Sequence, residues 1–145
     1  MKLIIKQSPD VTENQITIEC SYISPQLERI IKEIRSMDCV VNGREGDNWY
    51  RIPLDEIVYF DSVDSKTFLY SKQKCYEVKE SLGELEQRYR NMNFLRISKN
   101  TLIHLDKMKS TKVLPFSKME VTMVSGEKLI VTRHYLENFR KSFGI

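Results

Sequence analysis

The first forty residues show two short alternating runs of apolar and polar positions, followed by apolar positions at helical spacing. The runs 2–7 and 15–23 are rich in β-branched residues and predict two strands. Ser24 and Pro25 predict a helix start, because the hydroxyl can accept an unpaired backbone amide and proline sacrifices no hydrogen bond there. The helix, predicted over 25–36, has an apolar face made of Leu27, Ile30, Ile31 and Ile34. So small a unit cannot bury a core alone and must pack on the rest of the chain or on a second copy.

From residue 40 onward the pattern is one of short apolar segments separated by turn residues. Hairpins are predicted around the turns at 46–47, 72–73 and 125–127, where glycine or polar pairs separate the strands. The segments that predict strands are 40–45, 48–53, 57–60, 67–71, 74–78, 94–105, 112–116, 120–124 and 128–132. A short amphipathic stretch with Tyr135, Leu136 and Phe139 closes the chain.

One helix stands out within this strand-rich part. Ser81 and Glu84 have the spacing of a capping box, in which side chain and backbone satisfy each other's unpaired groups. Apolar residues then recur on one face of a helix predicted over 82–92. We therefore expect a mainly β fold, α+β overall, with short antiparallel sheets and one or two helices. A small strand–strand–helix unit at 1–39 would precede a β domain at 40–145.

The net charge of +3 is unevenly distributed along the chain. Residues 1–40 carry a net charge of −1, residues 41–95 carry −2, and residues 96–145 carry +6. A localised basic surface suits a polyanion, because each neutralised phosphate releases condensed counterions. A solvated basic face that only keeps the protein soluble would have the same composition, so charge alone does not separate the two readings.

The cysteines and histidines give no indication of a metal site. Cys20, Cys39 and Cys75 are odd in number and form no CxxC pair, and His104 and His134 lie thirty residues apart. Reduced thiols in a cytoplasmic protein are the expected state. The sequence contains no signal peptide and no apolar run long enough to cross a membrane. We expect no metal and no cofactor.

Enzyme signatures are also absent, since the sequence has no P-loop, GxGxxG, GxSxG or HExxH motif. The acidic pairs Asp55/Glu56 and Asp61/Asp64 are interpreted as surface carboxylates, with nothing nearby to suggest shifted pKa values. The alternation of strands and helices that a phospho-acceptor receiver domain needs is missing. We therefore expect no catalysis and no small-molecule substrate.

The segment RISKN (96–100), together with Arg133 after a later strand, is the most notable polar cluster. Arginine and lysine can neutralise phosphate or read guanine, asparagine can pair with adenine, and a serine hydroxyl can bind phosphate. A polar surface loop would have the same residues, so the cluster by itself leaves both interpretations open.

The order of four segments resembles the LytTR family of bacterial transcription regulators. The segments are IPLDEIVYFDS (52–62), ESLGELEQRY (80–89), NFLRISKNTLIHLDKM (93–108) and EVTMVSGEKLIVTRHYLENF (120–139). The resemblance runs from Val41 to the end of the chain. It implies an elongated β domain whose loops enter successive major grooves of double-stranded DNA, usually at direct repeats.

The resemblance also implies which residues contact DNA. They lie in the loop after the IVYF strand, in RISKN, and after the last hairpin: Lys66, Thr67, Arg96, Ser98, Lys99, Asn100, Arg133 and His134. Ser98 and Asn100 depart from the residues that many members carry, which changes the expected target sequence and not the fold. Asp61 and Asp64 would repel phosphate near the first loop.

The partner expected from this resemblance is double-stranded DNA. A second copy of the chain is expected for a different reason, since the apolar face of the helix at 25–36 is too large for so small a core. The unit 1–39 replaces the usual receiver domain and is interpreted as a packing or homodimerisation unit. The resemblance also implies a further partner, a regulatory membrane protein that holds the regulator inactive. Two other functions remain open: a module that titrates a protein partner without binding DNA, and a single-strand binder with Tyr59, Phe68 and Tyr70 as stacking platforms.

Overall fold

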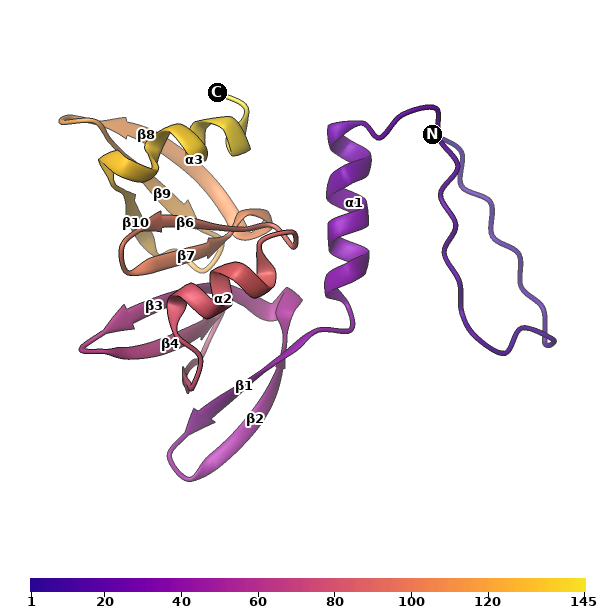
Figure 1. Cartoon of the computed structure of the whole chain (residues 1–145), viewed down its shortest axis with the longest axis horizontal. Coiled ribbons are helices and arrows are strands. Elements are labelled where there is room, and N and C mark those ends of the chain that lie inside the picture. The colour runs from indigo at the N-terminus through magenta and orange to yellow at the C-terminus, as the bar shows by residue number, and fades with distance from the viewer.

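A computed structural model describes all 145 residues as ten strands and three α-helices, arranged in two antiparallel sheets (Figure 1). The larger sheet has the order β2-β1-β5-β4-β3-β7-β6, and the smaller has the order β10-β9-β8. The strands of the larger sheet are β1 (Val40–Glu45), β2 (Asn48–Pro53), β3 (Ile57–Val63), β4 (Lys66–Ser71), β5 (Cys75–Val78), β6 (Phe94–Ser98) and β7 (Thr101–His104). Those of the smaller are β8 (Met108–Leu114), β9 (Lys118–Met123) and β10 (Lys128–Val131).

The helices are α1 (Pro25–Ser36), α2 (Leu82–Tyr89) and α3 (Leu136–Phe143), and the chain also contains three short 3-10 turns. These turns are η1 (Leu54–Glu56), η2 (Leu105–Lys107) and η3 (Arg133–Tyr135). The mainly β, α+β architecture predicted from the sequence is confirmed. Two of the three helices belong to the β domain, as predicted.

The larger sheet separates two hydrophobic cores, which gives the domain its layers. The first core lies between this sheet and α2 and includes Phe60, Leu85 and Leu102. The second includes Ile103, Val121 and Phe139, and it packs the smaller sheet and α3 against the opposite face. Successive residues of a strand point to opposite faces, which is why the neighbours Leu102 and Ile103 serve different cores.

The predicted helix starts are confirmed by their hydrogen bonds. The Ser24 hydroxyl accepts from the Leu27 amide at 3.2 Å, and the Ser81 hydroxyl accepts from the Glu84 amide at 3.2 Å. Each bond satisfies one of the backbone donors that a helix leaves unpaired at its first turn. The predicted hairpins β1–β2, β4–β5 and β9–β10 are also present.

Three predicted boundaries were wrong in detail. The stretch 94–105 is a hairpin, β6–β7, because Lys99 and Asn100 form a tight turn in its middle. Strand β8 begins earlier than expected and ends at Leu114, since Pro115 lies in the turn that follows. Helix α2 ends at Tyr89 rather than at residue 92.

The two strands predicted at 2–7 and 15–23 are absent, which corrects the strand–strand–helix description of residues 1–39. These segments lie extended but exposed, on the far side of α1 from the β domain (Figure 1). Strand propensity reflects packing on a half-buried surface, and an isolated hairpin is marginal in water. Within one chain neither segment finds such a surface. Only the predicted helix of this unit forms.

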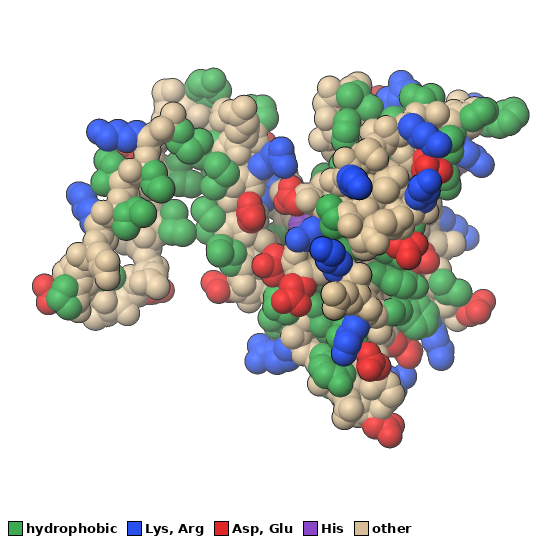
Figure 2. All heavy atoms as spheres, turned by 180° about the vertical axis from the view of Figure 1, so that it is seen from behind, with side chains coloured by type: hydrophobic (Ala, Val, Ile, Leu, Met, Phe, Trp, Pro, Cys, Tyr) green, Lys and Arg blue, Asp and Glu red, His purple; other side chains and the backbone are tan.

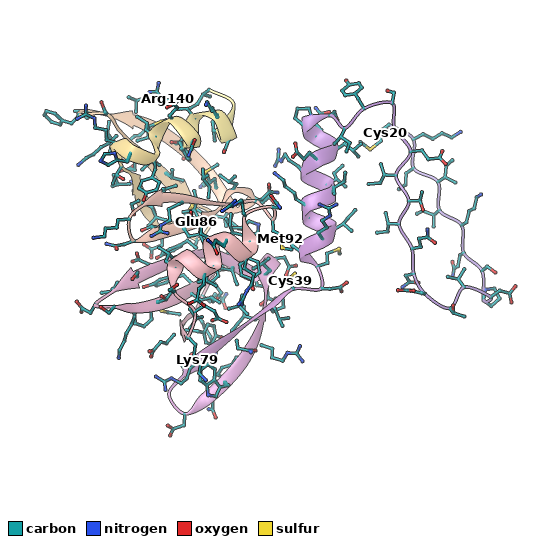
Figure 3. The ribbon with its side chains drawn as sticks, viewed as in Figure 1. Cys20, Cys39, Lys79, Glu86, Met92 and Arg140 are labelled. Atoms are coloured by element: carbon teal, nitrogen blue, oxygen red, sulfur yellow. The ribbon has the colours of Figure 1, made fainter.

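Helix α1 lies beside the domain and contacts it mainly where its C-terminal end joins β1. Cys39, just after the helix, lies 3.8 Å from the Met92 sulfur (Figure 3), and its carbonyl accepts from the Leu54 amide at 2.9 Å. Near the other end, the Arg29 guanidinium lies 3.5 Å from the Asp106 carboxylate. None of the helices combines the length and the apolar composition needed to cross a bilayer.

Candidate nucleic-acid interface

The three segments predicted to contact DNA lie side by side at one end of the domain. The Ser62 amide donates to the Asn100 carbonyl at 2.8 Å, which joins the β3–β4 turn to the β6–β7 turn. The Thr132 amide donates to the Ile97 carbonyl at 2.9 Å, which joins the end of β10 to β6. Segments about seventy residues apart in the sequence thus form one continuous edge, on the left in Figure 1.

The first of these segments is the β3–β4 turn. Asp64 and Ser65 occupy the left-handed backbone region, with φ of 51° and 65°, which closes the two-residue turn between the strands. Lys66 follows the turn and is exposed, whereas the Thr67 residue is only 7% exposed. Of the two residues predicted here, Lys66 is therefore the one whose side chain can reach an external ligand.

The second segment is the β6–β7 turn, which Arg96 braces from within the protein. The guanidinium donates to the Ser98 carbonyl at 3.0 Å, to the Lys99 carbonyl, and to the Glu86 carboxylate of α2 at 2.9 Å. Figure 3 shows Glu86 on the side of α2 that faces β6. The Arg96 side chain is only 21% exposed, so in this structure it positions the turn; its predicted contact with DNA stays a prediction.

The same turn presents two residues outward. Lys99 and Asn100 are exposed, and the Ser98 hydroxyl accepts from the Asn100 amide at 3.3 Å. This local hydrogen bond is a common way for serine to stabilise a tight turn. The Ser98 hydroxyl is therefore bound to the backbone of its own turn, whereas the side chains of Lys99 and Asn100 can contact a ligand.

The third segment is η3, which carries Arg133 and His134. Both side chains are exposed at the start of the turn that leads into α3. Phe139 of α3 is completely buried in the second core and fixes the helix to the sheet. Arg133 is therefore an exposed cation held on a well-anchored element, next to the β6–β7 turn.

Asp61 lies at this edge and has an unusual carboxyl group. Burial raises the pKa of the Asp61 carboxyl above its ordinary value, and the hydrogen bonds from the Thr101 hydroxyl and the Ser62 amide only partly counter this. The expectation of a surface carboxylate with an ordinary pKa is therefore wrong for Asp61, because the side chain is partly buried beside β7.

The aromatic residues proposed as stacking platforms are used within the protein. Tyr59 is 5% exposed, and its ring stacks on that of Tyr70 with centroids 4.3 Å apart. Burial also raises the pKa of Tyr70 to about 12. Phe68 is half-buried and lies on the same face of β4 as Tyr70, two residues along the strand. Cross-strand packing, and not base stacking, accounts for the tyrosine pair.

Two features, one at the site and one at the other end of β7, are not visible in the sequence. Glu86, which holds the Arg96 guanidinium, comes from a helix ten residues upstream, and no motif marks the pair. His104 is also buried, with its Nδ1 2.9 Å from the Ile57 carbonyl and its Nε2 3.6 Å from Asp106. It is a structural histidine, and no group of three metal-binding side chains surrounds it.

Replacing Glu86 with glutamine is expected to loosen the β6–β7 turn and to weaken binding to duplex DNA. The change removes the carboxylate that binds the Arg96 guanidinium. It should lower the free energy of unfolding by about 1 kcal/mol, since the pair is only partly buried. Losing a negative charge would by itself strengthen binding to a polyanion. Glu137→Gln makes the same charge change at an exposed position of α3 and is the control in a fluorescence-anisotropy titration. Equal affinities for the two variants would contradict a positioning role for Glu86.

Comparison with known proteins places this geometry in a family. Residues 47–144 match the LytTr DNA-binding domain family. The LytTr DNA-binding domain of a Bacillus cereus protein, described as a methyl-accepting/DNA response regulator, superposes with a TM-score of 0.70. It is 25% identical and covers 73% of this chain and 97% of its own.

A curated relative is the sensory transduction protein LytR of Staphylococcus haemolyticus (strain JCSC1435), 26% identical over 96 residues. The match covers 66% of this chain but only 38% of that protein, so it concerns one part of the relative. The matched family spans more than half of the chain, and the solved domain has the same fold. The chain therefore belongs to the LytTR family of DNA-binding domains.

Proposed function

We propose that the chain is a transcription regulator that reads the sequence of double-stranded DNA through the three loops at one end of its β domain. Lys66, Lys99, Asn100, Arg133 and His134 supply the exposed contacts. The loops would enter successive major grooves, with direct repeats as the target arrangement. The observation that carries this proposal is the pair of backbone hydrogen bonds that holds the three loops side by side.

The chemistry of the exposed residues supports base-specific contacts as well as contacts with phosphates. Asn100 can form two hydrogen bonds to adenine and Arg133 can form two to guanine, whereas Lys66 and Lys99 suit phosphate. The loops are short turns between hydrogen-bonded strands, so little conformational entropy is lost when they bind. A set of contacts held in fixed relative positions can discriminate between base sequences.

The alternative is a protein-interaction module that meets an acidic partner with the same basic end and does not bind DNA. Selection on a pool of random duplexes at two salt concentrations, followed by sequencing, separates the two functions. We expect enrichment of a repeated motif and weaker binding at the higher salt concentration. Salt-sensitive retention without an enriched motif would refute sequence reading, and no retention at all would favour the protein partner. A single-stranded pool run in parallel tests the third possibility.

We further propose that residues 1–39 join two copies of the chain. The segments before α1 expose large apolar side chains that the chain itself does not cover, and Figure 2 shows them gathered there and on α1. They include Leu3, Ile4, Ile5, Ile16, Tyr22 and Ile23. Pairing with the same segments of a second copy would bury these residues and supply strand partners for their backbones. Two connected domains would also suit a repeated target.

Introducing a charge into each extended segment should separate the copies. We expect Ile5→Asp combined with Ile16→Asp to shift the molar mass in solution from dimer to monomer, because paired carboxylates resist burial in an apolar interface. Deletion of residues 1–38 should have the same effect. Ser8→Asp, in the exposed turn between the two segments, is the control and should remain dimeric. Light scattering after size-exclusion chromatography measures the mass, and an unchanged mass in the double variant would refute the proposal.

A further inference from the structure

The β8–β9 hairpin projects beyond the rest of the domain and carries an exposed aromatic residue at its tip. Leu114 pairs with Lys118, so Pro115, Phe116 and Ser117 form the loop. Phe116 is 91% exposed. Figure 2 shows hydrophobic side chains at the end of this projection, at the upper right of that view. No other part of the chain covers them.

The backbone at this tip disfavours phenylalanine. Phe116 and Ser117 have φ of 63° and 55°, the left-handed region in which glycine and asparagine are favoured and bulky residues are uncommon. Most hairpin tips with this geometry have glycine or asparagine for that reason. The folded chain gives this exposed aromatic no packing partner to offset its backbone strain, which favours a role in an external contact.

The tip lies at the same end of the molecule as the three loops. Met119, one residue after the tip region, pairs with Val131 of β10, and Arg133 follows two residues later. The Thr132 amide in turn binds the Ile97 carbonyl beside the β6–β7 turn. In Figure 1 the tips of β8–β9, β6–β7 and β3–β4 all point to the left. A duplex lying along this end would therefore run past Phe116.

The residues around the tip favour a nucleic acid over an apolar protein surface. Lys118 is exposed directly after the loop, and Lys112 lies two residues before Leu114. Lys112 is 3.6 Å from Glu120, a surface pair that is weak and easily exchanged for a phosphate. Both lysines lie on one face of the hairpin, one on each strand behind the exposed ring. This arrangement suits an apolar wedge at a base step with phosphates bound beside it.

We propose that the β8–β9 tip is a fourth DNA contact, in which Phe116 packs into a groove next to the one that Arg133 enters and bends the duplex there. Lys112 and Lys118, on one face of the hairpin, bind phosphates next to the ring. This inference rests on the proposed function, since it needs a duplex at this end of the domain. The tip would increase the affinity and bend the duplex, whereas the other three loops would determine which base sequence is bound.

Phe116→Asn separates the role of the ring from the stability of the turn. Asparagine suits the left-handed backbone, so the variant should fold with an unchanged or higher Tm. Removing one aromatic contact should weaken binding by about tenfold and reduce the bend. Val124→Asn is the control, because Val124 is an exposed apolar residue in the hairpin turn at the opposite end of the same sheet.

The measurements use the full chain and the tightest duplex recovered from the random pool, labelled with a fluorescent dye at each end. Anisotropy gives the affinity, and energy transfer between the dyes gives the bend. Weaker binding and a smaller bend in Phe116→Asn, with neither change in Val124→Asn, would support the proposal. Unchanged affinity and bend in Phe116→Asn would overturn it and leave the proposed function intact, with a protein partner for the tip. Failure of the unaltered chain to bind any duplex would overturn both.

Discussion

Replacing Phe139 with alanine is expected to lower the free energy of unfolding by about 3–5 kcal/mol. Phe139 is fully buried and packs among the residues of the second core, which joins α3 and the smaller sheet to the larger sheet. Truncation removes the apolar contacts of the ring and leaves a cavity that close-packed neighbours fill only in part. Equilibrium unfolding in urea, followed by circular dichroism, gives the free energy by linear extrapolation.

A second phenylalanine on the same helix provides the control. Phe143 stacks on Phe139 with ring centroids 5.9 Å apart, but it is 40% exposed. Phe143→Ala should therefore cost clearly less than Phe139→Ala, and Phe139→Leu should fall between them because it retains most of the volume. If both alanine variants lost the same stability, the second core would not be what holds α3 in place.

Local sequence signals predicted the elements whose stability is decided locally. Ser24 with Pro25, and Ser81 with Glu84, mark helix starts because the capping hydrogen bonds lie within one turn. The β1–β2 hairpin was likewise predicted with its observed bounds, since glycine and aspartate at 46–47 provide the turn. Such elements need no information from distant parts of the chain.

The errors occurred where distant contacts decide the outcome. Residues 2–7 and 15–23 have the composition of strands, but in one chain they have no sheet to join, so their propensity is not expressed. The β6–β7 turn lacks glycine and proline and looks like part of one long strand. Pairing with β3 across Asp61 and Thr101 shows where β7 begins.

The candidate site was also predicted only where local sequence is sufficient. The resemblance indicated residues in three loops, but a linear sequence cannot show that two backbone hydrogen bonds join those loops. Nor can it separate an arginine that braces a turn from one that faces solvent. Arg96 lies within β6 and Arg133 follows β10, and the position of Glu86 on α2, beside Arg96 alone, distinguishes their surroundings.

Replacing Arg133 with alanine is expected to weaken binding to the selected duplex by about 1–3 kcal/mol, or roughly 5-fold to 150-fold. Arg133 is exposed on η3, and its backbone is held by the contact of Thr132 with β6. An arginine that binds a guanine edge discriminates between bases, so its removal should cost more on the selected duplex than on a random one. Anisotropy titrations of both duplexes at one salt concentration measure this difference.

Variants of the neighbouring residues Asn100 and Lys99 distinguish base-specific contacts from phosphate contacts. Asn100→Ala should resemble Arg133→Ala, since its amide can read adenine. Lys99→Ala should weaken binding to all duplexes alike and flatten the dependence of affinity on salt concentration, because a phosphate contact releases counterions whatever the sequence. Equal losses on selected and random duplexes for Arg133→Ala would make Arg133 a phosphate contact as well. Sequence reading would then have to come from Asn100 and the β3–β4 turn.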